Sequence, residues 1–196
     1  MASVMTSRQS AELDHAFERN GWTSEDVKLA SGGEMLAQLL LVVRGRAKVV
    51  VSSILTLLRT ARIVAQPAVT SSKQYFEEAG VKLVGSNFEA QFYDLEVPAT
   101  GEAELAVRKL EQNSLDAPIL TELGEKAEIS VSQFRAFLLA NHGSSEVFIA
   151  YLRGNDGNLW AVRASWYAGY GGWSVFANSV ARPFRWFAGH QVLSRN

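Results

Sequence analysis

The last 37 residues of the chain, positions 160–196, constrain its fold more than any other segment. They hold nine of the chain's 20 aromatic residues, and no Asp, Glu or Lys occurs after Asp156. Because side chains alternate along a strand, Trp173, Val175 and Ala177 would share one uniformly apolar face. The opposite face mixes small, aromatic and polar residues. This pattern predicts a half-buried strand with an aromatic outer surface.

The second half of the chain is predicted to form one α+β domain. The predicted elements are one strand at 104–110, two helices at 117–126 and 131–141, and four short strands at 146–153, 159–166, 173–178 and 191–195. The Asn-Asp-Gly sequence at 155–157 is typical of a hairpin turn between two of these strands. One strand, two helices and then four strands indicate an α+β arrangement rather than a parallel sheet.

A smaller, helix-rich region of unknown role is predicted for residues 1–98, ahead of the domain at 99–196. The boundary is placed in the Pro-Ala-Thr-Gly turn that begins at residue 98. Within the first region, residues 49–51 are consecutive valines and suit a strand. Residues 87–97 alternate enough to be a strand or an extended connector.

Two helix starts in the first region have the spacing of capping boxes. Thr23 with Asp26 would open a short helix. Ser31 with Glu34 would open a longer apolar helix that stops at Gly45.

Composition excludes several classes of protein. The chain is 47% hydrophobic and 20% charged, with a formal net charge of −1, so it can build a core and is not expected to bind nucleic acid. With no cysteine, it cannot form disulfides, zinc–thiolate sites or a thiol nucleophile. Neither a signal peptide nor a transmembrane segment is expected, which leaves cytoplasmic, virion-associated and non-classically exported locations open.

Catalytic and metal-binding motifs are not found. His15, His142 and His190 share no ligand spacing, and the sequence has no Gly-rich phosphate loop and no Gly-x-Ser-x-Gly elbow. We therefore expect no enzymatic activity, no metal and no cofactor. The basic stretch from Arg44 to Lys73 could suggest nucleic-acid binding, but solvent-exposed charge explains it better in a nearly neutral chain.

The aromatic tail has two possible explanations. A surface dense in Tyr, Trp, Phe, Ser, Gly and Arg is typical of paratopes and of interface hot spots, because large rigid rings supply contact area at low entropic cost. A core rich in tryptophan would have the same composition, so composition alone does not decide between them.

A specific pattern of residues in the tail points to a known family. The residues of this pattern are Trp166, Gly169, Trp173, Val175, Ala177, Asn178, Ser179, Val180, Pro183, Arg185, Trp186, Gly189, Gln191, Val192 and the terminal Ser194, Arg195 and Asn196. This segment resembles the variable region of diversity-generating retroelement variable proteins, which have a C-type lectin fold. Residues from about 102 onward fit the same fold less specifically.

The resemblance implies a hypervariable region at about 160–196. In that family a reverse transcriptase copies a template with errors at adenines, so AAC and AAT codons become any codon ending in C or T. The implied variable, ligand-binding residues are Ser165, Tyr167, Tyr170, Gly171, Ser174, Phe176, Arg182, Phe184, Phe187 and His190. None of them is Trp, Met, Lys, Glu or Gln, which such codons cannot encode.

The resemblance also implies a fixed scaffold under the variable residues, formed by Trp166, Trp173, Val175, Trp186 and Val192. Pro183 and Gly189 would hold the loop between them. The acidic and amide calcium ligands of sugar-binding C-type lectins are missing, so calcium-dependent carbohydrate binding is not implied. The expected function is non-enzymatic binding of a protein or other macromolecular ligand of unknown identity.

Two alternatives to this function are considered. The chain could be a structural or viral assembly protein whose aromatic C-terminal surface is a subunit interface. It could also be an enzyme related to the formylglycine-generating branch of the same fold, although the absence of cysteines and metal ligands argues against that. The oligomeric state is left open.

Overall fold

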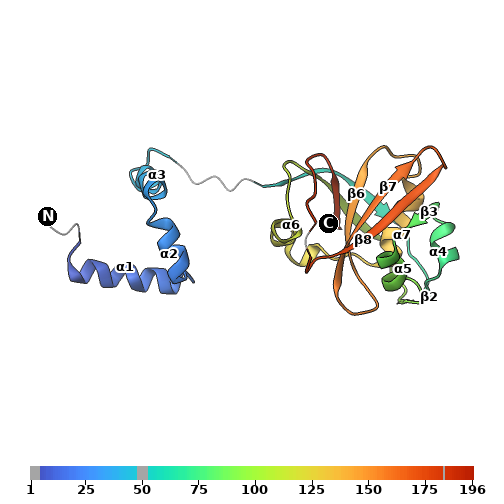
Figure 1. The fold of residues 1–196 in the computed structure, drawn as a ribbon, viewed down its shortest axis with the longest axis horizontal. Helices are drawn as coiled ribbons and strands as arrows, with labels where there is room; N and C mark the ends of the chain where they lie inside the picture. Colours follow the sequence, from blue (N-terminus) through green and yellow to red (C-terminus); the bar gives the residue numbers. More distant parts are fainter. Residues whose placement is uncertain (1–4, 48–52, 183) are drawn as a thin grey trace. The chain divides into compact units, whose positions relative to one another are not determined.

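The structure, a computed structural model, describes residues 5–47, 53–182 and 184–196. The chain divides into two compact units, Met1–Ser52 and Ser53–Asn196. Among the described residues, the first unit contains three α-helices, and the second contains four α-helices, a short 3-10 helix and a mostly antiparallel seven-stranded sheet (Figure 1). A mixed helix and strand fold, as predicted, is confirmed.

The boundary between the two units differs from the one predicted at 98/99. Strand β1 (Leu55–Ile63) pairs antiparallel with β5 (Ala103–Leu110) over its whole length. Residues 53–98 therefore belong to the same unit as the C-terminal half. The Pro-Ala-Thr-Gly segment is extended: Thr100 pairs with Gln66 in the same antiparallel register that joins β1 to β5. Local turn signals carry no information about which strands pair with the segment.

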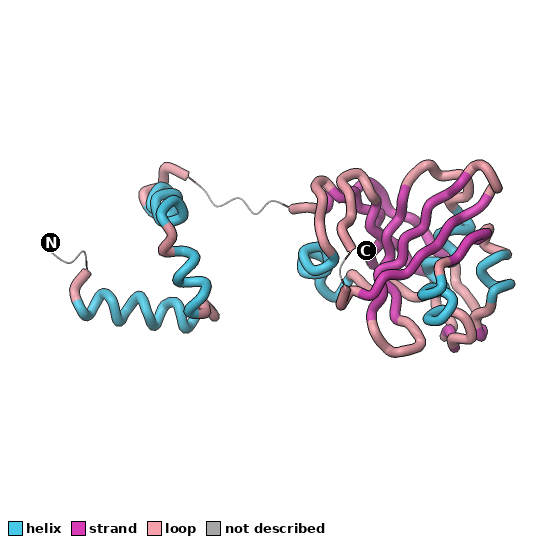
Figure 2. The backbone as a smooth tube through the Cα atoms, in the orientation of Figure 1, coloured by secondary structure: helices cyan, strands magenta, loops and turns pink. Residues whose placement is uncertain are grey.

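The centre of the sheet is built from the C-terminal strands (Figure 2). β6 (Val147–Arg153), β7 (Leu159–Tyr167) and β8 (Gly172–Ser179) form two consecutive antiparallel hairpins. The last strand, β9 (Gln191–Arg195), lies between β5 and β6, antiparallel to β5 and parallel to β6. The strands predicted in this half are confirmed, and the full order is β1-β5-β9-β6-β7-β8-β3.

The edge strand β3 (Val81–Val84) pairs parallel with β8 and completes the sheet. It follows the short helix α4 (Lys73–Glu77). A separate two-stranded sheet joins β2 (Val69–Thr70) to β4 (Glu96–Val97).

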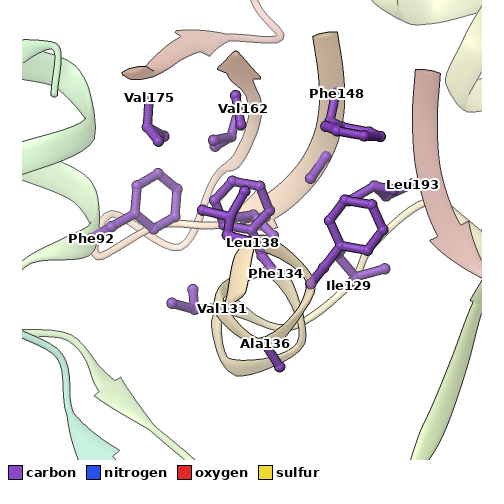
Figure 3. Packing of buried hydrophobic residues seen from close by; sticks show 14 of the residues in the cluster. Phe92, Ile129, Val131, Phe134, Ala136, Leu138, Phe148, Val162, Val175 and Leu193 are labelled. Atoms are coloured by element: carbon purple, nitrogen blue, oxygen red, sulfur yellow. The ribbon is translucent and has the colours of Figure 1, made fainter. Parts of the chain in front are cut away.

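Different helices cover the two faces of the sheet. Helix α7 (Val131–Ala140) contributes Phe134, Phe137 and Leu138 to a core on one face (Figure 3). Helix α6 (Asp116–Leu123), which continues into the 3-10 turn Gly124–Lys126, packs on the other face. The core on that face also includes Ile149, Tyr151, Ala161, Trp186 and Val192. Each central strand is therefore covered on both sides for part of its length.

The strand or connector predicted at residues 87–97 is wrong for most of that range. Residues Ser86–Phe92 form helix α5, and only Glu96 and Val97 are in a strand. Phe88 and Phe92 are four residues apart, fully buried, and have ring centroids separated by 4.9 Å. Residues at i and i+4 lie on one face of a helix, so burying both rings against the core favours the helix over the extended form.

The N-terminal unit contains α1 (Ser7–Arg19), α2 (Ser24–Ala30) and α3 (Gly33–Val43). The predicted capping box of α2 is confirmed: the Thr23 hydroxyl accepts from the Asp26 amide at 3.2 Å, and the Thr23 amide donates to the Asp26 carboxylate at 2.8 Å. Apolar side chains of α3, such as those of Leu36, Leu39 and Leu40, are exposed.

The second predicted box is wrong, although the helix it was expected to open is present. Helix α3 begins after Gly32, which makes no side-chain cap. The Ser31 hydroxyl instead donates to the Lys28 carbonyl at 2.8 Å, at the end of α2. The two helices are too close together for Ser31 to serve both ends.

The strand predicted at 49–51 lies outside the described residues. In the part of the chain that is described, no helix is long and apolar enough to cross a membrane.

Candidate functional site

The β7–β8 hairpin has the two unlike faces that its sequence predicts. Trp173 and Val175 are fully buried, and Ala177 is 4% exposed, in the core formed with α7. Trp166 pairs with Trp173 across the hairpin and packs on it edge to face, at 5.3 Å between ring centroids. The predicted scaffold residues of this hairpin therefore form its inner face.

The opposite face of the hairpin brings together predicted variable residues from both strands. Ser165 lies opposite Ser174, and Tyr167 lies opposite Gly172. Phe176 is half-buried, and its ring rests against the backbone of Gly85, where an added Cβ would lie 2.7 Å from the ring. We call Ser165, Tyr167, Tyr170, Gly171, Ser174 and Phe176 the hairpin group.

Two tyrosines dominate the tip of the hairpin group. The rings of Tyr167 and Tyr170 lie 4.6 Å apart, and the two residues are 58% and 44% exposed. The Tyr170 hydroxyl and the Ser174 hydroxyl form a hydrogen bond, which helps to cover Ser174 to 7% exposure. Ser174 thus contributes to the surface by positioning Tyr170 rather than by its own exposed area.

Gly171 is a predicted variable position whose backbone restricts the choice of residues. Its φ is +61°, in the left-handed region, within the turn that joins β7 to β8. Glycine, asparagine and aspartate adopt this conformation readily, whereas other side chains are strained there. All three residues are encoded by codons ending in C or T.

The other four predicted variable residues lie in the loop between β8 and β9. Arg182, Phe184 and Phe187 are exposed, and His190 is half-buried beside Phe187, at 5.8 Å between ring centroids. We call these four residues the loop group. Pro183, expected to hold this loop, lies outside the described residues.

Trp186 anchors the loop. It is fully buried, its indole Nε1 donates to Asp116 Oδ1 at 2.7 Å, and its backbone exchanges two hydrogen bonds with Ser114. The Tyr151 hydroxyl donates to the same Asp116 oxygen at 2.9 Å. Burial, and then the charge of the Asp116 carboxylate, raise the pKa of Tyr151, so this hydroxyl keeps the proton that it donates.

Arg163 is a central residue of this surface that the sequence analysis did not assign. It lies opposite Phe176 on the outer face of the hairpin, with its guanidinium carbon 5.4 Å from the centre of the Phe176 ring. Its charge also acts on His190 of the loop group. Arg163 therefore links the two groups. Its period-two spacing with Ser165 and Tyr167 was the available signal.

The pKa of His190 provides a test of this arrangement. Partial burial, and then the positive charge of Arg163, lower the pKa of His190 from the usual value near 6.5. A lowered pKa means that the unfolded chain binds the proton more readily than the folded chain. The stability that His190 contributes is therefore present above its unfolded pKa and lost as the pH falls through its folded pKa.

We expect His190 to titrate below pH 6.5 in an NMR titration of its ring, and Arg163→Gln to move this pKa upward. The matched control, Arg62→Gln, removes the same charge from an exposed ion pair on β1 and should leave the titration unchanged. If Arg163→Gln did not move the pKa, the two side chains would not face each other in solution.

The surface is separate from a cavity elsewhere in the second unit. That cavity has a volume of about 830 Å³, and its lining includes Leu120, Glu125, Glu128, Gln133 and Arg195. None of the predicted variable residues lines it. In the described part of the chain, no group of three or more His, Cys, Asp or Glu side chains is placed to hold a metal ion.

Comparisons with known proteins do not place the chain in a family. No protein-family model, curated protein or solved structure matches it. Its function is therefore argued from the arrangement of its own residues.

Proposed function

We propose that this chain displays a diversified ligand-binding surface on a C-type-lectin-like scaffold, with the variable side chains supplied by a retroelement. The observation that carries the proposal is the separation of the two sets of residues. The ten residues expected to vary lie on the outer side of the hairpin and in the following loop, while Trp173, Val175, Trp186 and Val192 are fully buried.

The order of elements also supports the scaffold. A strand, β5, is followed by the helices α6 and α7 and then by the strands β6 to β9. This is the order of two helices and short, mostly antiparallel strands expected from the resemblance of the C-terminal half to the lectin fold.

The geometry explains how such a surface could change without loss of the fold. Side chains on the outer face contribute little to the core, so their exchange costs little stability, whereas a change on the inner face would open a cavity. Four exposed rings, between 41% and 58% exposed, lie at the end of β7, in the turn that follows it and in the loop between β8 and β9: Tyr167, Tyr170, Phe184 and Phe187. Exposed rings spread in this way suit a broad macromolecular partner, and we propose a protein.

Diversification is tested by the DNA around the gene. We expect a near-copy of the codons for residues 160–196, with adenines at the ten variable positions, next to a gene for a reverse transcriptase. Arg163 and the scaffold residues should have the same codons in both copies. Complete flanking sequence without such a copy would contradict diversification by a retroelement.

Binding is tested by truncating exposed rings. We expect the double variant Tyr167→Ala, Phe187→Ala to weaken binding of protein domains selected on the full chain about hundredfold or more, because exposed aromatic anchors carry most of an interface's energy. Binding would be measured by biolayer interferometry, with binders drawn from a phage-displayed library of randomised small domains.

The control for this variant removes two exposed apolar side chains from another strand. Leu57→Ala, Leu58→Ala on β1, at 48% and 49% exposure, should leave binding unchanged. Melting temperatures of both variants should stay close to that of the parent chain. A large loss of stability in the Tyr167, Phe187 variant would make these rings part of the core and contradict the proposal.

The same exposed rings also favour a second candidate function, a subunit interface in an assembly. Light scattering over a range of concentrations separates the two. Self-association that disappears in the Tyr167, Phe187 variant would favour the assembly protein, whereas a monomer that binds selected domains favours the ligand surface.

A further inference from the structure

The surface contains a cation with no partner of opposite charge. Among the ion pairs of the described residues, none involves Arg163, Arg182 or Arg185. The sequence has no acidic residue after Asp156 that could supply one locally. These three arginines are therefore without an ion-pair partner among the described residues, in a chain whose net charge is −1.

Arg163 differs from the other two arginines in its burial. Arg182 and Arg185 are exposed, whereas Arg163 is half-buried and its Nε atom is inaccessible and has no hydrogen-bond partner within the described part of the chain. His190 Nδ1, on the neighbouring loop, is likewise buried without a partner. Taking a charge partly out of water without pairing it costs stability, and proteins normally avoid this by pairing the charge.

The guanidinium also has an aromatic neighbour. It lies over the Phe176 ring, which in turn rests on Gly85. A guanidinium is attracted to the face of an aromatic ring, and its planar fork loses little side-chain freedom for each hydrogen bond that it forms with a ligand. A guanidinium presented in this way matches a carboxylate, with which it forms two parallel charge-assisted hydrogen bonds.

We propose that Arg163 is a constant anchor for a carboxylate of an acidic protein ligand, and that the variable residues around it decide which acidic surface is bound. The inference rests on the proposed function. Arg163 is outside the ten positions expected to vary, yet it lies over the Phe176 ring of the hairpin group, and its charge acts on His190 of the loop group. Every diversified version of the surface would keep this cation, whichever side chain stands beside it at position 176.

The small number of positive charges on this surface favours an acidic protein over a nucleic acid as the ligand. Three unpaired arginines accompany at least four exposed aromatic rings, and the chain as a whole is slightly acidic. Nucleic-acid binding normally depends on many Lys and Arg contacts to phosphates. A single ligand carboxylate bound by Arg163, within an interface made mostly of aromatic rings, requires only one ion pair.

The first step of the test is selection on the full chain. A phage-displayed library of randomised small domains is panned against the parent chain, Arg163→Gln and the control Arg62→Gln. We expect clones selected on the parent chain and on Arg62→Gln to be enriched in Asp and Glu relative to the unselected library. Clones selected on Arg163→Gln should not be enriched.

The second step is a double-mutant cycle on the tightest clones. Changing the key Asp or Glu of a clone to its amide should weaken binding to the parent chain about tenfold or more, as for close charge pairs in other interfaces. On Arg163→Gln the same change should have less than about a twofold effect. If Arg163→Gln folds poorly, Arg163→Lys keeps the charge without the planar fork and should retain the acidic preference with weaker binding.

The outcomes separate this inference from the proposed function. Clones that require Tyr167 and Phe187 but show no acidic enrichment, with additive effects in the cycle, overturn the carboxylate anchor and leave the ligand surface intact. Failure to select any clone that depends on Tyr167 and Phe187 contradicts both. Tight binding of a labelled single-stranded oligonucleotide that depends on Arg163 would also overturn the acidic-protein ligand.

Discussion

Replacing Trp173 by alanine is expected to lower the free energy of unfolding of the second unit by about 4 kcal/mol, the largest stability effect that we predict in the hairpin. The indole is fully buried and packs on Trp166 and Phe148. Its Nε1 also donates to the Leu138 carbonyl at 3.2 Å, which ties β8 to α7. Alanine would leave a large cavity and remove this hydrogen bond.

Urea unfolding followed by circular dichroism would measure the loss. Trp173→Phe should cost less than alanine, because most of the apolar volume remains and only the hydrogen bond and part of the contact are lost. The control on the outer face of the same hairpin, Tyr167→Ala, removes a residue that is 58% exposed and should change the free energy by less than about 1 kcal/mol. Equal losses for Trp173→Ala and Tyr167→Ala would mean that the two faces are not distinct.

Replacing Trp186 by phenylalanine is expected to affect both stability and binding. The change keeps a buried ring but removes the hydrogen bond from the indole to Asp116, which lies in a buried setting at 1% exposure. Losing a donor to a buried carboxyl group costs about 2 kcal/mol. Because Trp186 is the buried anchor between the exposed Phe184 and Phe187, the loop group should also lose its fixed position.

Hydrogen exchange and binding together would check this second effect. Amides of Trp186 and Gly189, which donate to the Ser114 and Leu110 carbonyls, should exchange faster in Trp186→Phe, while those of β7 should be unchanged. Affinity for selected domains should fall more than it does in Trp22→Phe, a control in the N-terminal unit where the indole is 40% exposed. Unchanged exchange in the loop would show that the backbone hydrogen bonds hold it without the Asp116 contact.

Most strands and helices of the C-terminal half follow from local pattern. Period-two alternation predicted β8 and its buried Trp173, Val175 and Ala177, and the Asn-Asp-Gly turn predicted the hairpin between β6 and β7. These signals depend on residues close together in the chain. The helix α5 escaped prediction because its seven residues are too few to establish a period, and the burial of Phe88 and Phe92 selected the helix.

The sequence predicts ten residues of the candidate surface but not Arg163. These ten residues are expected to vary because of a resemblance in the tail, where each position is recognised by its place between framework residues. Arg163 lies ahead of Trp166, the first framework residue, and its period-two spacing with Ser165 does not indicate that it lies opposite Phe176 or that its charge acts on His190. Both placements depend on the register between β7 and β8 and on the path of the loop between β8 and β9.

The spacing of neighbouring residues therefore predicts most elements of the C-terminal half, the apolar inner face of the hairpin and the concentration of aromatic residues near the C-terminus. The start of the second unit depends instead on long-range pairing, since β1 belongs to this unit through its pairing with β5, 40 or more residues away in the chain. The tertiary structure also brings an unpaired cation, Arg163, near predicted variable residues of both groups. Both depend on contacts between residues far apart in the chain. The alternation of apolar and polar side chains along one strand does not indicate which strand pairs with it.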